Sequence, residues 1–163
     1  MMMENYLQVL EESLHKKMNV LCKIEEANIR QEKILRGSRV EADKFEDTIE
    51  EKGKLIEELN KLDDGFENLY AHIKEQLASG RERYKLQIAG LQKLIAEVTD
   101  KSVKIQAQEA RNKQLAEQFF ITSRRELQKG RQSSRAALNY YQSMNNSQMV
   151  EAQFMDQKKI VKK

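Results

Sequence analysis

The chain has 163 residues, no proline, six glycines and 34% charged residues, a composition typical of long helices rather than of sheet proteins. Hydrophobic residues make up 39% of it, enough for a thin helical bundle but little for a deep catalytic cavity, so we expect no enzyme. The net charge is +3, yet residues 1–77 carry −6 and residues 78–163 carry +9. The basic half can therefore pair with the acidic half or with an acidic partner.

No apolar run reaches the roughly 18 to 20 residues that a membrane span needs, and the N-terminal residues lack a signal-peptide pattern. We therefore expect a cytoplasmic chain without a membrane span. The single cysteine, Cys22, follows Leu21 in an apolar helical stretch and is interpreted as a packing residue.

The first helix is predicted over about residues 3–36. Its apolar seam consists of Leu7, Leu10, Leu14, Leu21, Ile24 and Leu35, and the polar residues Lys17, Asn28 and Gln31 interrupt it. Asn28 is either a buried residue that fixes helix register or an exposed one on a drifting stripe. Gly37 ends the helix, and Ser38 to Glu41 has the form of a capping box, which predicts a short turn to an antiparallel neighbour.

The second helix is predicted over about residues 40–77 and carries the clearest heptad seam of the chain. That seam is Phe45, Ile49, Lys52, Ile56, Leu59, Asp63, Phe66, Tyr70, Ile73 and Leu77. At Asp63 we expect the stripe to slip by one residue rather than bury a carboxylate. Gly53 and Gly65 indicate either close approach of a neighbouring backbone or tolerated fraying.

The third helix is predicted over about residues 80–128, again after a capping-box pattern, Ser79 to Glu82. Its seam is apolar up to Val98 and increasingly polar beyond it. A short helix is expected at 134–142 and a flexible tail at 143–163. The predicted fold is all-α, an elongated antiparallel bundle of three long helices with coiled-coil-like seams and a short or frayed C-terminal helix, forming one domain over residues 1–142.

Metal and nucleic-acid sites find little support in the residues. Glu12 and His15 form one Glu-x-x-His motif, but a di-iron bundle needs two, and His72 has no matching glutamate; we expect no metal and no cofactor. The basic residues near the C-terminal end are Arg124, Arg125, Lys129, Arg131 and Arg135. They lack a recognition motif, so a solvated face is favoured over nucleic-acid binding.

Apolar side chains gather towards the C-terminal end in an otherwise polar region. They are Phe119, Phe120, Ile121, Leu127, Leu138, Tyr140, Tyr141 and Phe154. Such a group suits either a docking surface for a partner helix or packing against the base of the bundle itself.

Three stretches in this order resemble the FlgN family of flagellar type III export chaperones: Glu51 to Leu59, Arg111 to Leu115, and Ala136 to Tyr141. The resemblance covers most of residues 4–142. It implies a cytoplasmic chaperone that binds helical C-terminal segments of hook-associated flagellar proteins, with the export apparatus as a further candidate partner. The contacts it suggests, together with neighbouring aromatic residues, are Asn112, Leu115, Phe119, Phe120, Leu127, Leu138, Tyr140 and Tyr141.

Two other functions fit the same pattern of residues. One is a structural scaffold or adaptor that forms a homo-oligomer through the heptad stripes, and the other is a basic helical protein associated with nucleic acid. The scaffold would depend on Ile56 and Leu59, whereas the chaperone would depend on the aromatic residues at the C-terminal end.

Overall fold

The computed structural model describes residues 3–126 and Tyr140. Three long helices account for most of them: α1 spans Met3–Arg36, α2 spans Ala42–Ser79 and α3 spans Lys85–Glu126. No strand occurs in this part of the chain. The predicted all-α fold is therefore confirmed.

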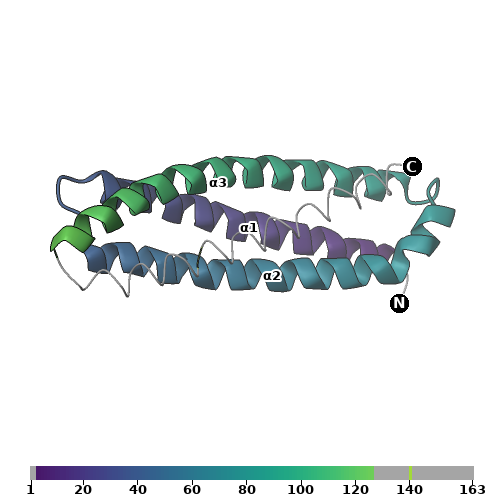
Figure 1. Cartoon of the computed structure of the whole chain (residues 1–163). Coiled ribbons are helices and arrows are strands. Elements are labelled where there is room, and N and C mark those ends of the chain that lie inside the picture. Colours follow the sequence, from purple (N-terminus) through teal and green to yellow (C-terminus); the bar gives the residue numbers. More distant parts are fainter. Residues whose placement is uncertain (1–2, 127–139, 141–163) are drawn as a thin grey trace.

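The helices lie side by side as an elongated rod, with α1 between α2 and α3 (Figure 1). The chain reverses direction at each connection. Helix α2 therefore runs antiparallel to α1, and α3 runs antiparallel to α2 and parallel to α1 (Figure 1). The backbone of α1 packs closely against both neighbours, whereas within the described residues α2 and α3 meet only through longer side chains. The heptad stripe of α2 is thus covered by helices of the same chain.

The apolar core divides into two clusters along the rod. The cluster that we call the apolar end contains Leu7, Leu10, Leu14, Phe66, Tyr70, Ile73, Leu77, Tyr84, Ile88, Leu91 and Ile95. The other cluster contains Val20, Leu21, Ile24, Leu35, Phe45, Ile49, Leu55, Ile56, Leu59, Val98, Ile105, Ala116 and Tyr140. Burying these side chains in register along the rod supplies the main drive for folding.

A buried ion pair joins α1 and α2 between the two clusters. On α1 it follows Leu14 and precedes Val20, and on α2 it follows Leu59 and precedes Phe66. The Lys17 Nζ of α1 is 2.7 Å from Asp63 Oδ1 of α2, and both side chains are almost wholly removed from solvent. The expectation that the stripe slips at Asp63 was therefore wrong. The carboxylate keeps its seam position because a lysine on the facing helix compensates its charge.

Both predicted capping boxes are also wrong. The residue before α2 is Glu41, in extended conformation and without a side-chain cap, so Ser38 lies outside the helix. At the second connection, Ser79 Oγ donates backwards to the carbonyl of Gln76, and α3 begins only at Lys85. Both connections are therefore longer than predicted, since α2 begins at Ala42 and α3 at Lys85.

Close backbone approach does not explain the glycines of α2. A Cβ atom placed on Gly53 or Gly65 would meet no other atom within 4 Å. Neither glycine is therefore required by packing of the described residues, and the alternative of tolerated fraying remains.

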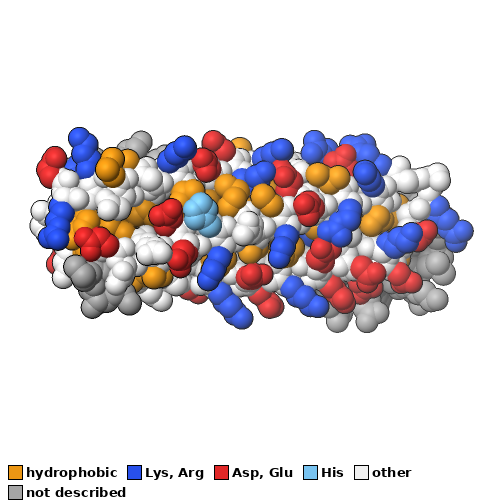
Figure 2. Space-filling view, turned by 180° about the vertical axis from the view of Figure 1, so that it is seen from behind, with side chains coloured by type: hydrophobic (Ala, Val, Ile, Leu, Met, Phe, Trp, Pro, Cys, Tyr) orange, Lys and Arg blue, Asp and Glu red, His pale blue; other side chains and the backbone are white. Residues whose placement is uncertain are grey.

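Acidic residues of α1 form ion pairs with basic residues of α3, as the opposite net charges of the two halves of the sequence allow. Glu25 of α1 lies 3.1 Å from both Lys101 and Lys104, and Glu32 lies 2.9 Å from Arg111. Burial alone would raise the pKa of Glu25, but hydrogen bonds from the two lysines lower it below its ordinary value. On the face seen in Figure 2, acidic and basic side chains alternate on both sides of a lengthwise apolar band.

Candidate partner-binding end and its polar layer

The second half of the rod differs from the apolar end because polar side chains occupy its interior. We call this set the polar layer: Asn28 and Gln31 of α1, Thr48 and Lys52 of α2, and Gln108, Glu109 and Asn112 of α3. All are buried. On each helix they stand at or beside a seam position, so heptad geometry points them towards the common axis.

Hydrogen bonds join the layer across all three helices. Lys52 Nζ donates to Gln31 Oε1 at 2.8 Å and forms an ion pair with Glu109 at 3.0 Å. The Asn112 amide donates to the same Gln31 oxygen at 3.1 Å and to the backbone carbonyl of Asn28 at 3.0 Å. The layer therefore fixes the relative height of the three helices, which apolar contacts alone would specify less sharply.

Lys52 is the most perturbed titratable group of the layer. Burial lowers its pKa to about 8, although the carboxylate of Glu109 acts in the opposite direction. At neutral pH the amine is thus still charged, and its charge is neutralised by a partner that is itself buried.

Tyr140, which lies beyond α3 in the chain, completes this layer. Its side chain is only 3% exposed. The hydroxyl donates a hydrogen bond to Glu109 Oε1, and the Lys52 amine lies 4.0 Å from the centre of the ring. Tyr140 is consequently held by both members of the Lys52–Glu109 ion pair through two different interactions.

An aromatic group closes the same end of the rod. The buried ring of Phe45, near the start of α2, contacts the rings of Phe119 and Phe120 edge-on, each at 5.8 Å between centres. Phe119 and Phe120 are only half-buried, and the next residue, Ile121, is 54% exposed. Apolar surface is thus left uncovered on the last turns of α3.

The residues predicted to contact a partner fall into three groups. Leu115, Phe119 and Phe120 are half-buried on the outer part of α3, where a partner can reach them. Asn112 and Tyr140 lie inside the bundle. Leu127, Leu138 and Tyr141 lie outside the described residues, as do the predicted helix at 134–142 and the tail at 143–163.

The sequence reasoning did not assign Lys52, Glu109 and Phe45 to the site. The signal that could have found them is the coincidence of polar seam positions, since Gln31, Lys52 and Asn112 all interrupt apolar stripes.

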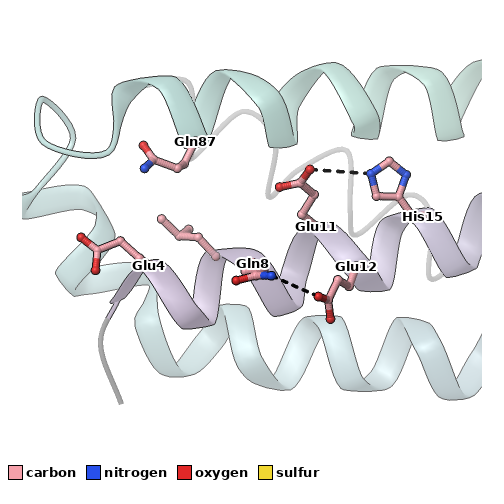
Figure 3. Close-up of a pocket in the computed structure, with 7 residues that line it drawn as sticks. Glu4, Gln8, Glu11, Glu12, His15 and Gln87 are labelled. Atoms are coloured by element: carbon pink, nitrogen blue, oxygen red, sulfur yellow. Dashed lines mark hydrogen bonds and ion pairs between the residues drawn. The ribbon is translucent and has the colours of Figure 1, made fainter.

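A second feature, a surface hollow between α1 and α3, lies at the opposite end of the rod. Figure 3 shows Glu4, Gln8, Glu11, Glu12 and His15 projecting from α1 and Gln87 from α3. His15 pairs with Glu11 at 3.7 Å, and Gln8 donates to Glu12 at 3.4 Å (Figure 3). Glu12 and His15, the pair of the Glu-x-x-His motif, are thus engaged separately.

The described residues also bear on metal binding and membrane insertion. They contain no group of three or more His, Cys, Asp or Glu side chains arranged to hold a metal ion. Between residues 3 and 126, no helix has a stretch long and apolar enough to cross a membrane. Of the predicted basic cluster, Arg124 is exposed near the end of α3. Arg125 has no described side chain, and the other members lie outside the described residues.

Comparison with family models gives one match, to the FlgN protein family, over residues 1–148. The chain belongs to the FlgN family. Neither the curated proteins nor the solved structures compared with it give a match. The match spans nearly the whole chain and includes all three helices and Tyr140. As a member of this family, the protein is a flagellar export chaperone, and chaperones of this family are not enzymes.

Proposed function

We propose that this FlgN-family protein binds the helical C-terminal segment of a hook-associated flagellar protein in the cytoplasm, before export. The docking patch is the uncovered surface at the end of α3. Its described members are Leu115, Phe119, Phe120 and Ile121. Leu127, Leu138 and Tyr141, which lie outside the described residues, are further proposed contacts. Asn112 and Tyr140 are buried in the bundle beside the patch and are not part of it.

The observation that carries the proposal is the position of Ile121. It is a large apolar side chain, more than half exposed, beside two half-buried phenylalanine rings that rest on Phe45. Successive helix residues point about 100° apart, so Phe119 and Ile121 lie on nearly opposite sides of α3 and the surface offered to a client helix consists of the exposed parts of Phe120 and Ile121. The rigid aromatic layer beneath them keeps the surface in place, which lowers the entropic cost of binding.

A chaperone for export must also release its client. A small patch supported by half-buried rings offers limited apolar area, so the complex can be specific without being too stable to dissociate. The exposed basic residues Lys113 and Arg124 on the same part of α3 can add electrostatic attraction to an acidic client helix.

The scaffold alternative has less support. It requires the heptad stripe of α2 to face other chains, but Ile56 and Leu59 are fully buried within this chain. Loss of either side chain should therefore lower monomer stability rather than dissolve an oligomer.

The test compares two exposed apolar residues at opposite ends of α3. Ile121→Ala should weaken binding of a peptide from the C-terminal segment of a hook-associated protein about fivefold to tenfold, as expected for an interface anchor. Leu86→Ala is the matched control, since Leu86 is 86% exposed at the other end of the helix. Isothermal titration calorimetry measures both, and circular dichroism checks that each variant keeps its helicity.

The two variants can give other results. If Leu86→Ala weakens binding and Ile121→Ala does not, the client binds at the end of α3 that contains Leu86, and the proposed location of the docking patch is wrong. If the peptide binds none of the proteins, a hook-associated client is excluded.

A further inference from the structure

Tyr140 occupies the place where side chains of α2 and α3 meet. We call this place the α2–α3 seam and define it by Phe45 and Lys52 of α2 and by Glu109, Phe119 and Phe120 of α3. In the described bundle the backbones of α2 and α3 each approach α1 and not each other. At the seam, the ring that packs into the core comes from outside all three helices.

The contacts of Tyr140 are specific rather than merely apolar. Its hydroxyl donates to Glu109, and its ring lies under the Lys52 amine, 4.0 Å from it. A hydrogen bond to a charged acceptor is stronger than a neutral one, and a cation over an aromatic ring adds further attraction when both are shielded from water. The seam thus holds one aromatic side chain in one orientation.

The docking patch continues directly into this seam. Phe45 and Lys52 are two turns apart on α2, about 10 Å, and Glu109 and Phe119 are about 15 Å apart on α3. Both phenylalanines of the patch pack on the same cluster to which Tyr140 belongs. A client helix of four or more turns that covers Phe119 and Phe120 along the seam therefore reaches the place occupied by Tyr140.

We propose that Tyr140 competes with the client helix for the α2–α3 seam, so that the chaperone is self-inhibited until the client displaces this side chain. The inference rests on the proposed function. It reverses the role of Tyr140 from a client contact to an internal competitor. This competition raises the apparent dissociation constant of the client, which equals the intrinsic constant divided by the fraction of molecules in which the seam is open.

The two roles predict opposite effects of removing the side chain. In the full-length protein, Tyr140→Ala should bind the C-terminal peptide of a hook-associated protein about tenfold more tightly, because no charge-assisted hydrogen bond has to be broken first. Tyr140→Phe keeps the ring and loses only the hydroxyl, so it should bind about threefold more tightly. A client contact would instead lose affinity on either change.

Tyr84→Ala is the matched control. Tyr84 is a buried tyrosine of the apolar end, so its removal lowers stability without changing the α2–α3 seam. Its affinity for the peptide should equal that of the unmodified chain. If Tyr140→Ala loses helicity, Tyr140→Phe decides the question alone.

Each remaining outcome has a clear meaning. Equal or weaker binding by the folded Tyr140 variants overturns the competition and leaves the proposed function intact. Absence of binding by the unmodified chain and all variants overturns the proposed function, and the inference fails with it.

Discussion

The two ends of the rod use the same heptad seams for different purposes. At the apolar end, side chains such as Leu10, Ile73 and Leu91 meet across three helices without a buried charge among them. In the other half, the same kind of positions hold Lys52 and Glu109. Apolar contacts tolerate small shifts of one helix along another, whereas a hydrogen-bonded layer does not.

This difference indicates that the apolar end supplies stability and that the polar layer fixes the register of the helices. A buried ion pair is seldom more stabilising than well-packed apolar residues of the same size, so the polar layer costs stability that the apolar end supplies. What the layer provides is one defined register, next to the aromatic residues that we assign to the client. The part of the bundle in which the register of the helices is defined is thus the part that lies beside the docking patch.

The largest expected effect tests the polar layer. Glu109→Ala should lower the free energy of unfolding by about 3 to 5 kcal/mol, because it leaves the buried Lys52 charge without its carboxylate. Chemical denaturation at neutral pH measures the change.

At the apolar end, Leu91→Ala should lower the free energy of unfolding by about 2 to 5 kcal/mol, because apolar burial is lost and a cavity is left. The same denaturation experiment measures it.

A second substitution separates the two mechanisms. The double variant Lys52→Met/Glu109→Leu should recover most of the stability lost in Glu109→Ala, because no charge remains buried. Its client affinity should rise, because Tyr140 loses both the hydrogen bond to Glu109 and the Lys52 amine over its ring, and so competes less for the α2–α3 seam. If the double variant is no more stable than Glu109→Ala, burial of an unpaired charge is not what destabilises the single variant.

The pH dependence of stability gives a smaller effect. The Lys52 amine has an ordinary pKa of 10.5 in the unfolded chain and a pKa of about 8 in the bundle. Between these values the unfolded state binds more protons, so the contribution of Lys52 to stability rises with pH. From pH 8 to 9.5 the rise is about 2 kcal/mol relative to Lys52→Met/Glu109→Leu, in which neither buried group remains to titrate, since each pKa unit corresponds to about 1.4 kcal/mol.

Denaturation curves of the two proteins at several pH values in this range test the prediction. The stability difference between them should change with pH above 8 and stay constant between pH 6 and 7. A constant difference throughout would mean that Lys52 keeps its ordinary pKa in the folded protein.

The smallest effect concerns the glycines of α2. Gly53→Ala and Gly65→Ala should each raise stability by up to about 1 kcal/mol, because alanine favours the helix and its methyl group meets no neighbour within 4 Å. Thermal unfolding measures both. Gly53 lies one residue after Lys52, so a loss of stability at this site alone would show that the polar layer needs local freedom that alanine removes.

The helices were predictable from the sequence because apolar residues at heptad spacing leave few alternatives. The first helix was predicted over 3–36, and α1 has the same bounds. The start of the third helix was predicted at 80 but lies at Lys85. A capping-box pattern is short and occurs by chance, and the offset between helices depends on packing that a local motif does not contain.

Burial of the polar seam residues was harder to predict. The compensating partner of Asp63 is Lys17 on another helix, and Asn28 finds Gln108 on a third. One helix read alone cannot distinguish a slipped stripe from a buried carboxylate, since the deciding residue is far away in sequence. For Tyr140 the sequence left a docking surface and packing against the bundle both open, because an aromatic residue suits both a partner and a core; the structure shows it buried.

The central claim is that the client covers the end of α3 and the seam beside it, not the apolar end. Hydrogen–deuterium exchange of the full-length chaperone, with and without the C-terminal peptide of a hook-associated protein, tests it most directly. We expect slower exchange over residues 112–124 and 42–52 in the complex and unchanged exchange over residues 85–95. Protection confined to residues 85–95 and the facing part of α1 would contradict the account.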